Sequence, residues 1–277
     1  MTLLIKQRAF TLIEIAIVLV IIGFLLALFL SPLSVQIDQK NYAETKQKVE
    51  LIKESLLGYV VVNRRLPCPD NNGDGLEETN MGVVNNLPSA GQSTQSFTCI
   101  NLEGRLPFLT LGAERLDSWS NHFSYRVAQQ FSTRTVEWSG LNATGAVLSD
   151  TTFNLTNLGN IAVETRGDNS STAGVQEAKF INNLVTNAVV LIRSHGKNGY
   201  GALNISGTLL SAPPAINIDE NQNNNIGTVK RMRLIANLTA GCSDAVEGVT
   251  ACEFDDYIDW LPANLVFNRM VTTGQLP

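Results

Sequence analysis

One apolar run near the start of the chain constrains the fold more than any other feature. It extends from Phe10 to Leu30 and contains a single charged residue, Glu14. A helix of about 20 apolar residues crosses a hydrocarbon core of about 30 Å, so the run predicts a helix that spans a membrane. A carboxylate inside such a helix is unfavourable, by about 2.5–3.5 kcal/mol at the helix centre and by less near an end. We therefore expect a partner group that compensates the charge of Glu14.

The residues on either side of this run set its expected orientation. Lys6 and Arg8 precede the run, and the next charged residues, Asp38 and Lys40, lie well beyond it. Basic residues favour the cytoplasmic side of a membrane span, so we expect a cytoplasmic N-terminus and an exported remainder. A secretory signal peptide would have a shorter apolar stretch ending in a small-residue cleavage site, and the sequence after Leu30 has no such site. The run is therefore expected to be retained as a single-pass anchor.

The start of the run carries a specific pattern, in which Arg8 and Ala9 precede the sequence Phe-Thr-Leu-Ile-Glu at residues 10–14. This pattern resembles the class III signal of type IV pilins and type II secretion pseudopilins. The resemblance implies that a prepilin peptidase cuts between Ala9 and Phe10 and methylates the new amino terminus. It also implies that Glu14 pairs with the terminal amine of a neighbouring subunit, which would compensate its charge. Ala9 stands where the family usually has glycine, and alanine is still small.

A second, amphipathic stretch is expected to continue the helix beyond the membrane. Apolar residues recur at three- and four-residue steps from Val49 to Val60, and Lys and Glu occupy the other faces. Pro32 removes one backbone donor and is expected to kink the helix without ending it. The predicted domains are a leader at residues 1–9, a transmembrane half at residues 10–33, an amphipathic half at residues 34–63 and a head at residues 64–277.

The remaining chain predicts a β-rich head, because it is rich in Asn, Thr, Ser and Gly. Residues 188–192, which read Ala-Val-Val-Leu-Ile, are the best candidate for a central strand. Weaker strand candidates lie at residues 123–131, 160–165 and 229–238, and a short helix with Pro262 in its first turn is expected near the end. The expected fold class is α+β, a long N-terminal helix packed against a β-rich head, as the pilin resemblance implies.

Four cysteines predict two disulfides in the head. Cys68 and Cys99 bracket the segment after the long helix, and Cys242 and Cys252 bracket a short loop near the C-terminus. An even number of cysteines in an exported domain indicates disulfides, and local pairing is the simplest of the three possible connectivities. A bridge between Cys68 and Cys99 would stabilise the head by about 3–4 kcal/mol in the chain-entropy model. Reduced, buried thiols are the alternative. A zinc site is not expected, because no Cys-x-x-Cys motif occurs and the two histidines are isolated.

The best ligand pattern in the head lies at residues 70–78. Asp70, Asn72 and Asp74 alternate, a glycine follows, and Glu78 stands at position 9 of an EF-hand-like loop. Oxygen ligands at alternate positions suit one calcium ion, although position 12 carries methionine instead of the usual glutamate. The pattern predicts a calcium site at these four residues. A polar turn is the alternative, because Asn-Gly and Asp-Gly pairs form turns in their own right.

Further segments resemble parts of major pseudopilins, namely residues 65–69, 104–108, 117–125, 194–201 and 255–260. In major pseudopilins the glycine-rich loop and the acidic segment that follows it bind calcium. The resemblance therefore implies Asp255 and Asp256 as additional calcium ligands. Lys197 stands where the family has an acidic residue, and a plain turn is the alternative for the glycine-rich loop.

The sequence favours a structural subunit over an enzyme. No serine-hydrolase, zinc-protease or phosphate-loop motif occurs, and a net charge of −5 without a basic stripe argues against nucleic acid as a partner. We expect a minor pilin or pseudopilin of a type II secretion pseudopilus or a type IV pilus. Its implied partners are other pilin or pseudopilin subunits, the prepilin peptidase and the inner-membrane assembly platform. The alternatives are a membrane-anchored, calcium-dependent binding protein or adhesin, and an anchored hydrolase. The expected location is the bacterial inner membrane with the head in the periplasm.

Overall fold

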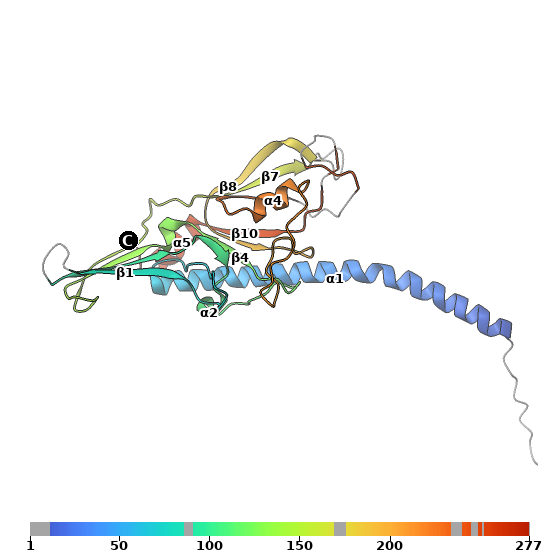
Figure 1. Ribbon diagram of the computed structural model, residues 1–277, viewed down its shortest axis with the longest axis horizontal. Helices are drawn as coiled ribbons and strands as arrows, with labels where there is room; N and C mark the ends of the chain where they lie inside the picture. The colour runs from blue at the N-terminus through green and yellow to red at the C-terminus, as the bar shows by residue number, and fades with distance from the viewer. Residues whose placement is uncertain are drawn as a thin grey trace, which may run out of the picture. The chain divides into compact units, whose positions relative to one another are not determined.

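One long helix, α1 (Leu12–Asn63), begins the part of the chain that the structure describes (Figure 1). The structure is a computed structural model and describes residues 12–85, 91–168, 176–233, 240–244, 249–250 and 252–276. The chain divides into two compact units, Met1–Ala43 and Glu44–Pro277. The second part of α1 therefore belongs to the same unit as the sheets, whereas the first part forms a unit by itself.

The second part of α1 forms one side of the hydrophobic core. Val49, Ile52, Leu56 and Val60 are completely buried, as their helical spacing predicts. Polar contacts fix the edges of this buried stripe: Lys53 Nζ lies 3.1 Å from Asp259 Oδ2 on the last strand. Helix α1 ends at Asn63, the residue at which the predicted amphipathic half ends.

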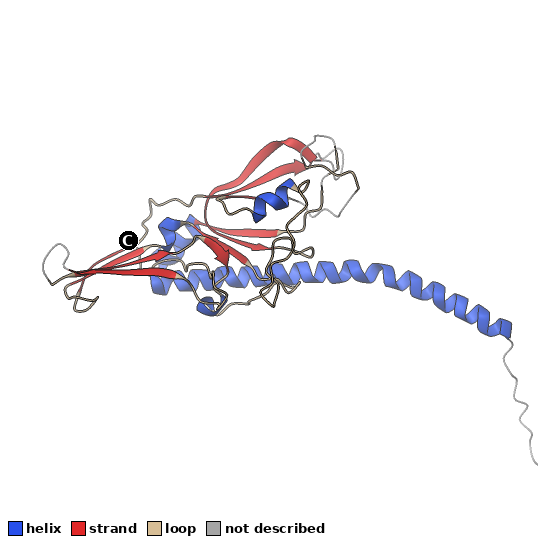
Figure 2. Cartoon of the chain, in the orientation of Figure 1, coloured by secondary structure: helices blue, strands red, loops and turns tan. Residues whose placement is uncertain are grey.

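Most of the regular structure after α1 is β-strand, as Figure 2 shows. A four-stranded antiparallel sheet has the order β1-β2-β5-β6. Its strands are β1 (Thr79–Asn85), β2 (Ser93–Cys99), β5 (Arg134–Trp138) and β6 (Val147–Thr151). The short helices α2 (Phe108–Leu111) and α3 (Gln129–Ser132) lie in the connections.

A six-stranded sheet carries the core of the head and has the order β3-β4-β8-β7-β9, with β10 also paired to β8. Its strands are β3 (Glu103–Arg105), β4 (Ser124–Val127), β7 (Ile161–Asp168), β8 (Gln176–Ser194), β9 (Val229–Arg231) and β10 (Tyr257–Pro262). All described pairs are antiparallel except β7 with β9. Helix α4 (Ile218–Asn224) precedes β9, and α5 (Ala263–Thr272) follows β10.

The α+β expectation is confirmed for the head and for the presence of the N-terminal helix. Residues 188–192 form the buried end of β8, which pairs with β4, β7 and β10 and is the central strand that the apolar run predicts. Ile161, Val163 and Ile258 pack against this end of β8. The aromatic rings of Phe131, Phe153 and Phe267 form a further cluster, with the centroids of Phe131 and Phe153 4.8 Å apart.

Three boundary predictions differ from the structure. The strand expected at residues 123–131 ends at Val127, because the chain turns into α3, where Phe131 is buried against Phe153. The strand expected at residues 229–238 is only three residues long, and residues 234–238 lie outside the described residues. Pro262 is the last residue of β10 and immediately precedes α5, one position before the predicted first turn.

The membrane-spanning half predicted at residues 10–33 lies only partly within the described residues, since Phe10 and the side chains of residues 25–34 are outside them. Within the described part of the chain, no helix has the combination of length and hydropathy that a membrane span requires.

Candidate functional site

The N-terminal processing site is divided between described and undescribed residues. Glu14 lies in the first turn of α1 and its side chain is exposed. Ala9 and Phe10, the predicted cleavage and methylation residues, lie outside the described residues. An acidic residue in the first turn of a helix is favourable because it faces the positive end of the helix dipole.

The loop at residues 70–78 brings three of its four predicted ligands together, but their oxygens already accept hydrogen bonds from the loop itself. Asp70 is completely buried, and its carboxylate accepts from the N–H groups of Gly73 at 2.6 Å and Gly75 at 3.0 Å. Asn72 and Asp74 each accept a backbone N–H two residues ahead, at 2.8 Å in both cases. These are the side-chain contacts of a polar turn.

The fourth predicted ligand, Glu78, is fixed through its backbone instead. Its N–H donates to Pro69 O and its carbonyl accepts from the N–H of Ile100. Within the described residues, no group of three or more His, Cys, Asp and Glu side chains is arranged to hold a metal ion. Calcium binding at residues 70–78 therefore stays a prediction.

The neighbouring Glu77, which the sequence pattern did not single out, anchors this loop to α1. Its carboxylate accepts two hydrogen bonds from Arg65, at 2.6 and 2.7 Å, and one from Tyr59 Oη at 2.6 Å. It also accepts the N–H of Cys68 at 3.0 Å. Burial alone would raise the pKa of Glu77, but the hydrogen bonds and charge of Arg65 lower it below its usual value. No local spacing signals this contact, because twelve residues separate Arg65 from Glu77.

The predicted disulfides are both formed, Cys68 with Cys99 and Cys242 with Cys252. The first bridge closes the segment that contains the loop at residues 70–78 at its base, beside Glu77. No free cysteine occurs among the described residues. The local pairing expected from the sequence is therefore the pairing in the structure.

A second acidic region forms where the glycine-rich loop meets the segment before β10. Asp255 Oδ2 accepts the N–H of Asn198 at 2.7 Å, so the two segments that resemble major pseudopilins lie against each other. Gly196 allows this approach, because a Cβ at its position would lie 2.3 Å from the carbonyl oxygen of Asp255. The other oxygen of Asp255 is buried without a hydrogen-bond partner among the described residues.

Glu220 of α4 joins this region, and nothing in the sequence pattern indicated it. Its carboxylate accepts from Asn198 Nδ2 at 3.0 Å and from the N–H of Asp255 at 3.2 Å. Burial, followed by the charge of Asp256, raises the pKa of Glu220 to about 7. Burial likewise raises the pKa of Asp255 to about 8. We call Asp255 and Glu220 the acidic pair; both hold protons more tightly than ordinary carboxylates do.

Asp256, the second predicted ligand here, points to different partners. Its Oδ2 accepts from Asn223 Nδ2 at 2.8 Å and lies 3.5 Å from Arg193 Nη1. Burial raises the pKa of Asp256, although Arg193 opposes this effect. Asp255 and Asp256 therefore have different partners. Of the two, only Asp255 shares Asn198 with Glu220 as a hydrogen-bond donor.

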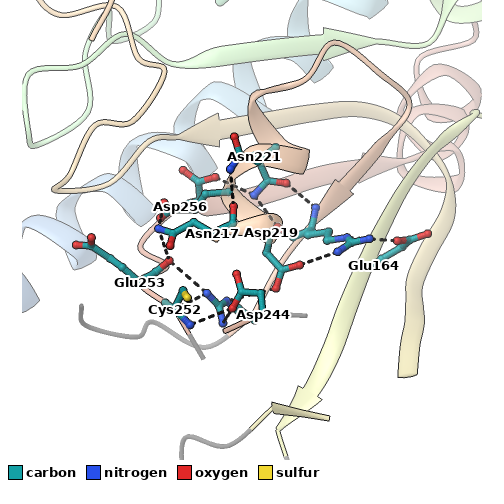
Figure 3. A network of polar contacts seen from close by, with 12 residues as sticks. Glu164, Asn217, Asp219, Asn221, Asp244, Cys252, Glu253 and Asp256 are labelled. Carbon is teal, nitrogen blue, oxygen red and sulfur yellow. Dashed lines mark hydrogen bonds and ion pairs between the residues drawn. The ribbon is translucent and has the colours of Figure 1, made fainter. Parts of the chain in front are cut away.

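A network of polar contacts among buried charges includes Cys252 of the second disulfide (Figure 3). Arg231 donates to Asp219 at 2.8 Å, and Arg233 donates to Asp244 at 3.2 Å and to the carbonyl of Cys252 at 2.7 Å. Asp244 also accepts the N–H of Cys252 at 3.0 Å. Removal of one member of such a buried pair is destabilising, because it leaves the other charge buried without compensation.

The comparisons identify the N-terminal segment. Residues 4–30 match the model of the prokaryotic N-terminal methylation motif, the signature of type IV pilin and pseudopilin substrates of prepilin peptidases. No curated protein and no solved structure is significantly similar to the chain. The motif indicates a structural, pilin-type protein that is processed by prepilin peptidase and assembles with other pilin subunits.

Proposed function

We propose that this chain is a minor pilin or pseudopilin, assembled into a type II secretion pseudopilus or a type IV pilus after cleavage behind Ala9. The methylation motif at residues 4–30 is the observation that carries the proposal. The buried stripe on the second part of α1 supports it, because the helix is an integral part of the head core. In such a subunit the second part of the helix is packed into the head, and the first part is available to neighbouring subunits.

Glu14 is the residue on which assembly depends in this proposal. After cleavage the amine of Phe10 is the charged group that a neighbouring subunit offers to the carboxylate, and a charge in an apolar surrounding needs such a partner. The apolar run of residues 10–30 then serves as the single-pass anchor in the inner membrane. The inner-membrane assembly platform is the machinery that would extract the processed chain.

Two measurements test this function. Mass spectrometry of the mature protein should find an N-methylated Phe10 terminus, and Ala9→Gly should hasten cleavage. Glu14→Leu should insert and fold normally but fail to enter filaments, as measured by crosslinking to other subunits in native membranes. Glu50→Leu is a matched control, since Glu50 is an exposed glutamate on the same helix. An intact Met1 terminus in peptidase-positive cells, or normal assembly of Glu14→Leu, would refute the proposal.

A further inference from the structure

A pocket of about 290 Å³ is lined by residues of strands β3, β4 and β8 and of the loops beside them, including Arg105, Ser124, Arg193 and His195. Arg105 stands opposite Ser124 in one strand pair, and Ser124 stands opposite Arg193 in the next. Residues directly opposite each other in antiparallel strands direct their side chains to the same face of the sheet. A serine hydroxyl therefore lies in one row between two arginines.

The serine is hydrogen-bonded to a histidine that a third group orients. Ser124 Oγ lies 2.7 Å from His195 Nε2, and His195 Nδ1 lies 2.8 Å from the carbonyl oxygen of Tyr200. A carbonyl oxygen only accepts hydrogen bonds, so Nδ1 carries the proton and Nε2 accepts the hydroxyl of Ser124. A nucleophile, a base and an orienting group within hydrogen-bond reach are the arrangement that activates a serine.

The protonation state of His195 suits a base. The ring is almost completely buried, at 2% exposure. Burial, followed by the charge of Arg193, keeps the pKa of His195 well below its usual value. The imidazole is therefore neutral near pH 7, which leaves Nε2 unprotonated, and the same shift makes it a weaker base than an ordinary histidine.

The two arginines can receive the negative charge that develops when a serine attacks a carbonyl. Arg105 Nη2 lies 3.6 Å from Asp70 Oδ1, and Arg193 Nη1 lies 3.5 Å from Asp256 Oδ2. Both separations exceed the roughly 2.7–2.9 Å of a strong charge-assisted hydrogen bond, so each guanidinium retains N–H groups for a second acceptor. Cationic donors directed at a forming oxyanion stabilise its charge.

The acidic residues of the lining are each paired with donors of their own. Both oxygens of Glu103 lie 2.6 Å from cations, one from Arg126 and the other from Lys230. Asp70 is held by the backbone of its own loop. The local excess of positive charge also affects Lys230. Burial, followed by the charge of Arg193, lowers the pKa of Lys230 to about 8.

We propose that this pocket hydrolyses small carboxylic esters, with Ser124 as the nucleophile and His195 as the general base. Ser124 Oγ bonds to the carbonyl carbon while its proton moves to His195 Nε2, and the carbonyl electron pair moves to oxygen beside the arginines. When the carbonyl reforms, the bond to the alcohol breaks and His195 returns its proton to the leaving oxygen. A water then attacks the acyl carbon while its proton moves to His195 Nε2. When the carbonyl reforms, the bond to Ser124 Oγ breaks and His195 returns the proton to Oγ, which releases the carboxylic acid and restores Ser124.

Covalent labelling of the full-length chain tests this proposal. Phenylmethylsulfonyl fluoride should form an adduct that peptide mass spectrometry maps to Ser124, and p-nitrophenyl acetate should be turned over. Ser124→Ala removes only one oxygen and should reduce turnover to the uncatalysed rate. His195→Gln should slow labelling of Ser124 by about 10²–10⁴-fold, the usual contribution of a positioned base.

Ser206→Ala is the matched control, because Ser206 is an exposed serine whose hydroxyl bonds only locally, to Asn204. In the Ser206→Ala variant, the rate of labelling at Ser124 and the rate of ester turnover should equal those of the unaltered chain. Adducts at other residues without one at Ser124, or undiminished turnover in Ser124→Ala, would overturn the proposal. An equal labelling rate at Ser124 in His195→Gln would also overturn it, since the serine would then not depend on the histidine.

Discussion

The two acidic regions of the head differ in how their carboxylates are satisfied. The loop at residues 70–78 has a recognisable ligand pattern, yet the side-chain oxygens of Asp70, Asn72 and Asp74 accept N–H groups of the loop itself. The acidic pair of Asp255 and Glu220 has no such pattern, yet both pKa values are raised by burial. A ligand-like spacing therefore does not tell whether the oxygens are available to an ion.

We expect the largest difference between the two regions in the free energy of unfolding, measured in the absence of calcium, when a carboxylate is removed by substitution. Asp70→Ala leaves the buried N–H of Gly75 without its acceptor, and it also removes the acceptor of the N–H of Gly73, which is exposed. An unsatisfied buried donor costs about 1–3 kcal/mol, so we expect the free energy of unfolding to fall by about that amount. Urea denaturation measures this change.

Asp74→Ala is the control within the same loop, because Asp74 is exposed. Surface substitutions usually change stability by about 0.5 kcal/mol or less, and loss of the local turn contact adds little to that. If Asp70→Ala were as mild as Asp74→Ala, the loop would not be held by its own carboxylate.

The next difference concerns pH. A carboxyl group whose pKa is raised on folding binds more protons in the folded state than in the unfolded state, so stability falls as pH rises from about 4 to about 8. Asp255→Asn removes one such group. The stability of this variant relative to the unaltered chain should therefore rise between pH 5 and pH 8, by up to about 1.4 kcal/mol for each pH unit.

Thermal unfolding of both chains across this pH range provides the measurement, and Asp74→Asn is a matched control on an exposed aspartate. A relative stability of Asp255→Asn that stays constant with pH would show that the acidic pair does not retain protons in the folded state. The comparison between the two regions would then rest on hydrogen bonding alone.

The smallest expected effect is that of calcium. We propose that a calcium-dependent rise in melting temperature requires Asp255 and does not require Asp74. The second carboxylate oxygen of Asp255 is buried without a partner among the described residues. At a calcium concentration equal to the dissociation constant the stabilisation is about 0.4 kcal/mol. For a domain of this size that corresponds to a shift of about 1–2 °C.

Calorimetry in about 1 mM calcium and in chelator compares the two variants at the affinity typical of extracellular sites. The shift should disappear in Asp255→Asn and persist in Asp74→Ala. Loss of the shift in Asp74→Ala would instead support the loop at residues 70–78 as the site. Identical melting in calcium and in chelator would remove calcium from both regions.

Several features of this protein were predictable because their signals are local. The methylation motif is a continuous stretch of residues 4–30. The buried stripe of Val49, Ile52, Leu56 and Val60 follows from helical periodicity, and the central strand follows from one apolar run at residues 188–192. The disulfides followed from an even count and short separations. Apart from the disulfides, which depend on the number of cysteines, each of these inferences needs only residues that are neighbours in the chain.

The tertiary structure alone decided which polar groups meet. Seventy-one residues separate Ser124 from His195, and 35 separate Glu220 from Asp255. Contacts over such distances depend on the register of β4 with β8 and on where α4 packs, and composition encodes neither. The sequence determined a processed N-terminal helix carrying a β-rich head. Folding determined which carboxylates keep their protons and which serine faces a base, because burial and hydrogen-bond partners exist only once the strands have paired.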